Sequence, residues 1–379
     1  MSVTAERRPA TRAGRLPERR YGTSGLTLAA AGLVLVSIPD NDAPVPQTLP
    51  PPLPQSRLAS AEAWPDAESA TFAGKLADGA TFQPGHLLDA RTAIGTAPGA
   101  DGRSLRLVLR HADGSIRQLR TLPRNRGPEF ASFASNATDV VWVENTTDDA
   151  PQIWAADMRD ARSSARRLVT DVGAADFTGA PDDLVINDGH VLWAAAGRGS
   201  DTTEIRSVPV GGGKVSVRAE PGTWLLSAWP WLTDGSDQTS TARLRNLDTK
   251  RDVEVNGSGT DLLTCGPTWC RVAVVGTGGI TRTDFMRHDG SARTTIATGA
   301  ASAIGTDVAV LDRFALFFET QPVPGANNQA TLIAYDLTLA GTVEVSPAAG
   351  SAFCRAGILW WSTGAGDFTT WHVLDLRTV

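Results

Sequence analysis

Short apolar strands separated by polar turns recur along this chain at intervals of about 40 residues, a period typical of repeat architectures. The clearest early unit contains four such segments, at 130–135, 140–144, 152–158 and 167–170. The second and third segments are strongly apolar, and the fourth is weaker. Because one unit of this size cannot bury its own apolar face, neighbouring units must stack around a common axis. The sequence therefore predicts an all-β fold, a β-propeller of four-stranded antiparallel blades.

The same order of strands recurs in seven units, over 87–122, 130–170, 184–218, 224–255, 262–297, 308–345 and 352–376. Seven blades are therefore favoured, and six result if the weak unit at 222–256 is not a blade. The last unit has only three strand segments. We expect Ala70–Lys75 to supply its fourth strand, because such closure removes two open sheet edges. In the sixth unit we expect Val308–Leu311 to be the innermost strand.

The N-terminal region differs in composition from the repeats. Residues 1–20 are rich in arginine, residues 21–39 carry no charge, and residues 40–66 are rich in proline. An uncharged apolar segment after basic residues is typical of a signal anchor or a signal peptide whose N-terminus lies in the cytoplasm. The proline-rich run favours a semi-rigid polyproline II spacer, which leaves 67–379 for the propeller.

From this order of segments we expect a hydrophobic helix that anchors the propeller to the cell membrane in a single pass, with the C-terminal domain outside. The apolar core of the segment is short for a membrane span and suits a signal peptide. A cleaved signal peptide and a secreted protein are therefore one alternative. A cytosolic protein is the other.

Three pairs of second and third strands carry a family resemblance: W-V-E-N…I-W-A-A-D-M, L-F-F-E-T…L-I-A-Y-D-L and L-W-W-S-T…W-H-V-L-D-L. In four units an aspartate lies at or near the end of the third strand, at Asp157, Asp289, Asp336 and Asp375. In these features the chain resembles TolB-like and WD-repeat-like β-propellers. The resemblance implies the propeller fold and a tendency to bind partners, and it carries no catalytic residue across.

Two cysteines, Cys265 and Cys270, lie in the sequence C-G-P-T-W-C. The alignment of the units places them at the end of one strand and the start of the next, facing each other across a hairpin. Cysteines so placed have a Cα separation suited to a disulfide, which fits an exported protein. A redox pair and two unpaired thiols are the alternatives, although redox motifs place two residues between the cysteines and here there are four. We expect Cys354 to be a small buried apolar residue.

Tryptophans fall into two groups in the alignment. Trp142, Trp193 and Trp360 recur in the second strand of their units, which predicts packing between blades. The weak unit contains three more that are the better candidates for an exposed binding surface: Trp224, Trp229 and Trp231.

No pattern in the sequence indicates a catalytic, cofactor-binding or metal-binding residue. No two of the five histidines are spaced as a metal pair, and we expect each to be structural or exposed: His86, His111, His190, His288 and His372. The glycine runs at 210–214 and 276–280 lack a following helix, so neither predicts a phosphate loop. The paired acids Asp148-Asp149 and Asp182-Asp183 lie in polar loops, as solvated turn acids or, alternatively, as cation ligands.

The net charge of the chain restricts the classes of partner that it can bind. The chain has a formal net charge of −6 although its first segment is basic, so the propeller itself is acidic. An acidic body argues against nucleic acid as a partner, because affinity for nucleic acid comes largely from clustered cations.

These observations favour a monomeric, membrane-tethered, extracytoplasmic propeller that serves as a protein- or ligand-binding or scaffold module, with no cofactor. A propeller hydrolase or lyase acting on cell-wall or extracellular polymers is the alternative. Acidic, histidine or arginine side chains from three or more units that converge on a funnel at the axis would favour the enzyme. The ligand itself has no signature in the sequence.

Overall fold

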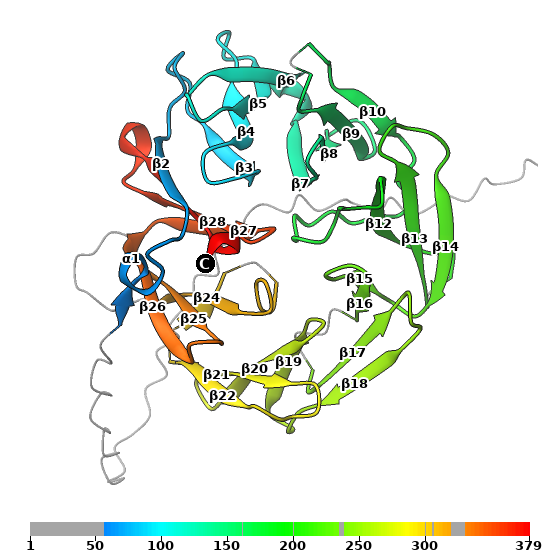
Figure 1. The fold of residues 1–379 in the computed structure, drawn as a ribbon. Coiled ribbons are helices and arrows are strands. Elements are labelled where there is room, and N and C mark those ends of the chain that lie inside the picture. The colour runs from blue at the N-terminus through cyan, green and yellow to red at the C-terminus, as the bar shows by residue number, and fades with distance from the viewer. Residues whose placement is uncertain are drawn as a thin grey trace, which may run out of the picture. The chain divides into compact units, whose positions relative to one another are not determined.

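The computed structural model describes residues 57–379, with the exception of 161, 200, 235–238, 300, 305–306 and 320–329. Seven sheets stand around a central axis as the blades of a propeller (Figure 1). Neighbouring strands are antiparallel within every blade, except that the outermost strand of blade 6 is parallel to its neighbour. The predicted all-β propeller is confirmed with seven blades, and the weak unit at 222–256 is one of them.

The strands of the first four blades follow one another in chain order. Blade 1 contains β3 (Gln83–Leu87), β4 (Ala93–Pro98), β5 (Ser104–Arg110) and β6 (Ile116–Pro123). Blade 2 contains β7 (Glu129–Ser135), β8 (Asp139–Asn145), β9 (Gln152–Asp157) and β10 (Arg166–Val169). Blade 3 contains β11 (Val185–Asn187), β12 (His190–Ala196), β13 (Thr202–Pro209) and β14 (Ser216–Pro221). Blade 4 contains β15 (Leu225–Leu226), β16 (Trp231–Thr233), β17 (Thr241–Asn246) and β18 (Asp252–Asn256).

The last three blades complete the ring, and two of them include strands from the start of the described chain. Blade 5 contains β19 (Asp261–Cys265), β20 (Trp269–Gly276), β21 (Gly279–Arg287) and β22 (Thr294–Thr298). Blade 6 contains β23 (Ala301–Ala303), β24 (Phe314–Glu319), β25 (Ala330–Asp336), β26 (Gly341–Ala349) and β1 (Leu58–Ala59). Blade 7 contains β27 (Ser351–Arg355), β28 (Ile358–Thr363), β29 (Thr370–Asp375) and β2 (Ser69–Ala73). The described helices are short: α1 (Ser60–Ala63) and the 3₁₀ helices η1 (Arg124–Arg126), η2 (Gly366–Phe368) and η3 (Leu376–Thr378).

Apolar side chains on both faces of the second strands form the core, because each blade is covered by a neighbour on either side. Trp142 lies in the cluster between blades 1 and 2, together with Ile94 and Leu107. Trp193 lies between blades 2 and 3, and Trp360 lies between blades 7 and 1. All three indoles are essentially inaccessible to solvent. The prediction that they pack between blades is confirmed.

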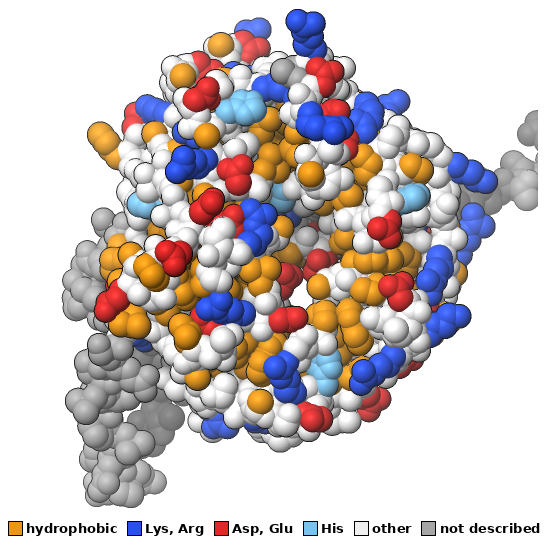
Figure 2. Space-filling view, in the orientation of Figure 1, with side chains coloured by type: hydrophobic (Ala, Val, Ile, Leu, Met, Phe, Trp, Pro, Cys, Tyr) orange, Lys and Arg blue, Asp and Glu red, His pale blue; other side chains and the backbone are white. Residues whose placement is uncertain are grey.

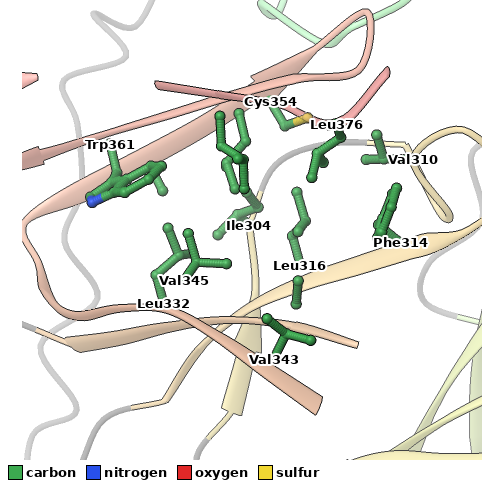
Figure 3. Packing of buried hydrophobic residues seen from close by; sticks show 14 of the residues in the cluster. Ile304, Val310, Phe314, Leu316, Leu332, Val343, Val345, Cys354, Trp361 and Leu376 are labelled. Atoms are coloured by element: carbon green, nitrogen blue, oxygen red, sulfur yellow. The ribbon is translucent and has the colours of Figure 1, made fainter. Parts of the chain in front are cut away.

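The contact between blades 6 and 7 shows this packing in detail (Figure 3). Phe314, Leu316 and Leu332 of blade 6 share one cluster with Cys354 and Trp361 of blade 7. Cys354 is 1% exposed, as expected of a small apolar residue. Fully burying a side chain of the size of Leu contributes roughly 1.5–3 kcal/mol, so contacts of this kind hold the blades together.

The predicted closure of the ring is also confirmed. β2 pairs with β29 in antiparallel register, from Ser69 opposite Leu374 to Ala73 opposite Thr370. Blade 7 therefore takes three strands from the end of the chain and its outer strand from the beginning.

A second early segment, before β2, binds the edge of blade 6. β1 pairs with β26 in parallel, and Arg57 makes two hydrogen bonds of 2.6 and 2.7 Å to the carboxylate of Glu319. Trp64 is buried, and its indole N–H donates to Asp336. The proline-rich spacer was expected to extend to residue 66, but the segment from Arg57 onward packs on the propeller, so the expected boundary at 67 lies too far along the chain.

Blade 6 differs from the prediction at its innermost strand. Val308–Leu311 does not form that strand, which is β23 instead. Val310 makes only an isolated bridge to Phe314, because Leu311 and Asp312 both adopt positive φ angles and turn the chain tightly into β24. The apolar composition of the segment is explained by burial of Val310 in the contact with blade 7.

In the part of the chain that the structure describes, no helix is both long enough and apolar enough to span a membrane. The basic segment 1–20, the expected hydrophobic helix at 21–39 and the spacer as far as residue 56 lie outside the described residues.

Candidate functional site

The predicted disulfide is present. Cys265 and Cys270 are bonded, with their Cα atoms 4.1 Å apart. They lie directly opposite each other in the pairing of β19 with β20. Both side chains are buried in the core between blades 4 and 5. The bond therefore closes the inner hairpin of blade 5.

The expected aromatic surface of the weak unit is wrong for Trp224, which is 5% exposed. Its indole N–H donates to the carbonyl oxygen of Pro221 at 2.6 Å, and its ring lies beneath the guanidinium of Arg245. Trp229 and Trp231 are half-buried and pack against core clusters. These large rings fill space that the short strands of blade 4 leave between the blades.

Three of the histidines make hydrogen bonds to neutral groups of their own blade or turn. His288 hydrogen bonds to the carbonyl oxygen of Gly266, and His372 to the hydroxyl of Thr363. His190 is exposed beside its turn. These positions are structural or superficial.

Charged side chains from separate parts of the chain meet near the axis of the ring. Asp182 and Asp183 lie between β10 and β11, Asp307 lies between β23 and β24, and Arg355 ends β27. The guanidinium of Arg355 interacts electrostatically with all three carboxylates. Figure 1 shows β27 and the connections that precede β12 and β24 around the centre of the ring. In Figure 2 acidic side chains lie beside the opening at the centre of this face. We call these four residues the axial cluster.

Arg355 joins the cluster to the connection between blades 2 and 3. Its Nη2 donates a hydrogen bond to the carbonyl oxygen of Gly179. Its Nη1 is covered by protein atoms and has no hydrogen-bond partner among the described residues. Burial lowers the pKa of Arg355, and the carboxylates around it oppose that shift. The guanidinium remains charged, because arginine does not lose its proton in proteins.

Asp183 holds its own loop in place. Its Oδ2 accepts hydrogen bonds from the backbone N–H groups of Gly179 and Ala180, at 2.7 and 3.0 Å. The hydroxyl of Ser132, in β7, donates to the same oxygen at 3.0 Å. Burial nevertheless raises the pKa of Asp183 above its ordinary value. The loop that carries two acids is therefore bound to the inner edge of blade 2.

Asp182 and Asp307 form a coupled pair. Burial, the charge of Asp307 and a hydrogen bond with it raise the pKa of Asp182 to about 8. Burial also raises the pKa of Asp307. At neutral pH the two carboxyl groups therefore hold a proton between them, as closely spaced acids do. Asp182 and Asp183 lie in a turn, as expected, but they are half-buried and contact Ser132 and Asp307 from other parts of the chain.

His86 lies close to the cluster but is neutral. It is 2% exposed, in β3, and its Nε2 lies 2.8 Å from the hydroxyl oxygen of Ser135. Burial, together with the smaller effect of the charges of Arg355 and Arg377, lowers the pKa of His86 to about 3. A neutral imidazole adds no charge to the axial cluster, whose balance is set by three carboxylates and one guanidinium.

A cavity of about 600 Å³ adjoins the cluster on the side of blades 3 and 4. Asp182 and Asp183 belong to its lining, and most of the remaining wall is apolar or small. Within the described residues, no group of three or more His, Cys, Asp or Glu side chains is arranged to hold a metal ion.

Sequence reasoning missed Asp307 and Arg355. Neither belongs to a motif, and nothing in their immediate sequence distinguishes them from other turn and strand-end residues. The adjacent pair Asp182-Asp183 was the only signal, and it acquires meaning once the ring places it opposite an arginine of blade 7.

The comparisons with known proteins concern the fold alone. No family model and no curated protein matches the sequence. Among solved structures, the chain is similar to the β-propeller domain of the Trilobed protease from Pyrococcus furiosus, with 9% identity, a TM-score of 0.48, and coverage of 79% of this chain and 94% of that one. The tricorn protease matches with 10% identity and a TM-score of 0.44 over 77% of this chain, which spans only 33% of that protein.

A TolB structure is also among the matches, as the strand motifs predict. The putative TolB from Agrobacterium tumefaciens shows 13% identity and a TM-score of 0.38, over 61% of this chain and 83% of that one. The topology itself defines the class, a seven-bladed β-propeller closed by an N-terminal strand.

Proposed function

We propose that this protein is a membrane-tethered, extracytoplasmic binding module that receives its ligand at the axial cluster. The observation that carries the proposal is the convergence of three carboxylates and one guanidinium from distant segments of the chain. Propellers hold their blades together with apolar contacts, and this chain does so at every interface described above. The axial cluster is not needed for that packing.

Burying the charged side chains of the axial cluster costs free energy that apolar side chains in the same positions would not cost. Moving a charged group out of water costs several kcal/mol per ion even after relaxation, and unpaired buried charge is the most expensive case. Here Arg355 Nη1 has no hydrogen-bond partner among the described residues, and burial raises the pKa of each of the three acids. Groups perturbed in this way and gathered in a cleft are typical of functional sites.

Ligand binding at the cluster can be tested by thermal unfolding of the full chain with separate panels of amines, carboxylic acids, short peptides and oligosaccharides. At least one class should raise the unfolding temperature of the wild-type protein and of Asp188→Asn, an exposed control in a turn of blade 3. The same ligands should have little effect on Asp182→Asn and Arg355→Lys. A ligand that stabilises all four proteins equally binds elsewhere and contradicts the proposal.

The proposed compartment rests on the uncharged segment 21–39 after six arginines. The disulfide is consistent with it, because such bonds persist mainly in oxidising compartments. Cell fractionation should place the full chain in the membrane fraction, with Cys265 and Cys270 protected from alkylation until a reductant is added. Recovery of a reduced, soluble protein from the cytosol would contradict both the tether and the compartment.

A second function, hydrolysis of an extracellular polymer, is favoured by the same convergence of acids and arginine at the axis and by one further observation. Asp182 and Asp307 share a proton, and a carboxylic acid beside a carboxylate can act as general acid and general base. Turnover of a peptide, ester or glycan by the wild-type protein that is lost in Asp182→Asn would establish this function. It would also refute the proposal of a binding module, which predicts no turnover.

A further inference from the structure

The cavity beside the axial cluster arises from two local departures from the repeat. The second strand of blade 3 ends in three alanines, Ala194–Ala196, which follow Trp193 and leave this end of the strand with small side chains only. Blade 4 opens with β15 and β16, which have only 2 and 3 residues. Small side chains on one wall and a short blade on the other leave the space unfilled.

The lining of this cavity combines three acidic side chains with largely apolar or small ones. Asp176, Asp182 and Asp183, from the connection between blades 2 and 3, belong to the lining together with apolar side chains such as Ala195, Trp224 and Leu226. No lysine or arginine belongs to the described lining. Leu225, which also belongs to the lining, is 56% exposed.

We infer that this cavity binds a small organic cation, with its ammonium group at Asp182 and Asp183 and its apolar body between β12 and β15. The inference rests on the proposed binding function and names the class of ligand. The volume of about 600 Å³ lies within the range of small-molecule sites, which combine apolar walls with a few placed polar groups. The carboxylates disfavour an anion beside them, and the apolar walls favour an organic body over a hydrated metal ion.

The charges of the axial cluster support this class of ligand. Three carboxylates face a single guanidinium, so the site lacks positive charge, and it compensates by retaining a proton between Asp182 and Asp307. An incoming ammonium group would supply the missing charge. Because a nearby cation favours the ionised form of an acid, binding should release that proton to the solvent.

Titration calorimetry with the full chain tests the inference with three probes that share one indole body. Tryptamine carries an ammonium group, tryptophol is its neutral alcohol, and indoleacetate is an anion. Tryptamine should bind at least about tenfold more tightly than tryptophol, as a charge-assisted hydrogen bond implies, and indoleacetate should not bind. The heat of tryptamine binding at neutral pH should depend on the ionisation enthalpy of the buffer, because a proton is released.

Variants locate the site. Asp182→Asn should weaken tryptamine binding at least about tenfold and abolish the proton release. Ala196→Leu, at the mouth of the cavity, should weaken all indole binding by filling the space, and its unfolding temperature will show whether it is folded. Asp188→Asn should bind tryptamine as the wild-type protein does. Tryptamine binding should strengthen from pH 6 to pH 9 in the wild-type protein, as Asp182 ionises, and not in Asp182→Asn.

Three outcomes would overturn the inference. Tryptophol or indoleacetate that binds as tightly as tryptamine, in a manner sensitive to Ala196→Leu, would show a ligand site of another chemistry and leave the binding module intact. Tryptamine binding that neither Asp182→Asn nor Ala196→Leu changes would place the amine elsewhere. Absence of tryptamine binding would refute the cation site, and the ligand panels described above would then decide the binding function independently.

Discussion

Asp182 shows at the residue scale how burial reverses the usual behaviour of an acid. Its folded-state pKa of about 8 lies above the ordinary aspartate value of about 3.9. A group whose pKa rises on folding stabilises the native state fully below its unfolded pKa. That contribution is lost as pH rises through the folded pKa. The axial cluster therefore makes the folded state progressively less stable as the pH rises from about 4 to about 8.

We predict that Asp182→Asn removes part of this pH dependence. The amide can donate a hydrogen bond to Asp307 as the protonated acid does, but it cannot ionise. Urea unfolding at about pH 5 and about pH 8 should show a smaller loss of stability in the variant, which should exceed the wild-type protein in stability at the higher pH. Equal slopes in the two proteins would contradict the buried, protonated state of Asp182.

The pKa of Asp336 shifts in the opposite direction to that of Asp182. Burial acts to raise the pKa of Asp336, but Arg313 and the backbone N–H groups of Leu339 and Thr338 donate hydrogen bonds that lower it overall. The indole of Trp64 donates to the same carboxylate, which is fully buried. Because its folded pKa is depressed, its contribution is present above about pH 4 and is lost as pH falls.

Asp336→Asn should lower the free energy of unfolding at neutral pH by about 3 kcal/mol, because it leaves the charge of Arg313 without its partner. Denaturant unfolding measures this directly, with exposed Asp289→Asn as the control in an equivalent turn. A change below about 0.5 kcal/mol, the size expected of a surface substitution, would contradict the role of this pair.

At this scale the sequence predicted the residues that repeat and missed those that do not. Trp142 and Trp193 occupy equivalent positions, so their shared burial could be foreseen. Trp224 has no equivalent, and its burial depends on how short blade 4 is. Asp307 and Arg355 meet only because the ring brings blades 6 and 7 next to the connection between blades 2 and 3, which no local pattern encodes.

The observed strands agree best with the predicted ones where a strand is apolar on both faces. The second strands β8, β24 and β28 are recognisable because both their faces are covered. Strand β23 was misplaced, because apolar Val308–Leu311 has the composition of a strand but the geometry of a turn. Composition alone does not distinguish the buried residues of a strand from buried residues in a turn beside a strand.

The hairpin of β19 and β20 gives a prediction at the scale of the element. Replacing Cys265 and Cys270 together with alanine should lower the free energy of unfolding by about 2 kcal/mol, because the unfolded chain regains the freedom that a short closed loop loses. Unfolding of the wild-type protein with and without reductant should give a similar difference. A variant as stable as the oxidised protein would show that this bond does not contribute to stability.

At the scale of the whole molecule, the ring depends on one short strand. β2 covers the outer edge of β29, and Phe72 of this strand is buried between blades 7 and 1. Without β2, the edge of β29 would be open to pairing with another chain. Closure was predictable, because the last repeat lacked a strand and a matching segment preceded the first.

Deleting residues 1–74 should therefore lower the stability of the propeller by at least about 3 kcal/mol, the cost of losing a buried phenylalanine alone. The truncated protein should also self-associate, which size-exclusion chromatography can measure. Deletion of residues 1–54 retains every described residue of the propeller and provides the control. Equal melting temperatures for the two truncations would show that β2 is dispensable.

The pairing of β2 with β29 also determines when blade 7 can be completed during synthesis of the chain. β2 leaves the ribosome before all but one of the described strands, and its partner β29 leaves after all the others. The first six blades can assemble as they emerge, but β2 must wait with an unsatisfied edge until almost the whole chain has been made. Contacts so distant in sequence form slowly, so this strand is the segment that a newly made chain most needs to keep from pairing with the wrong neighbour.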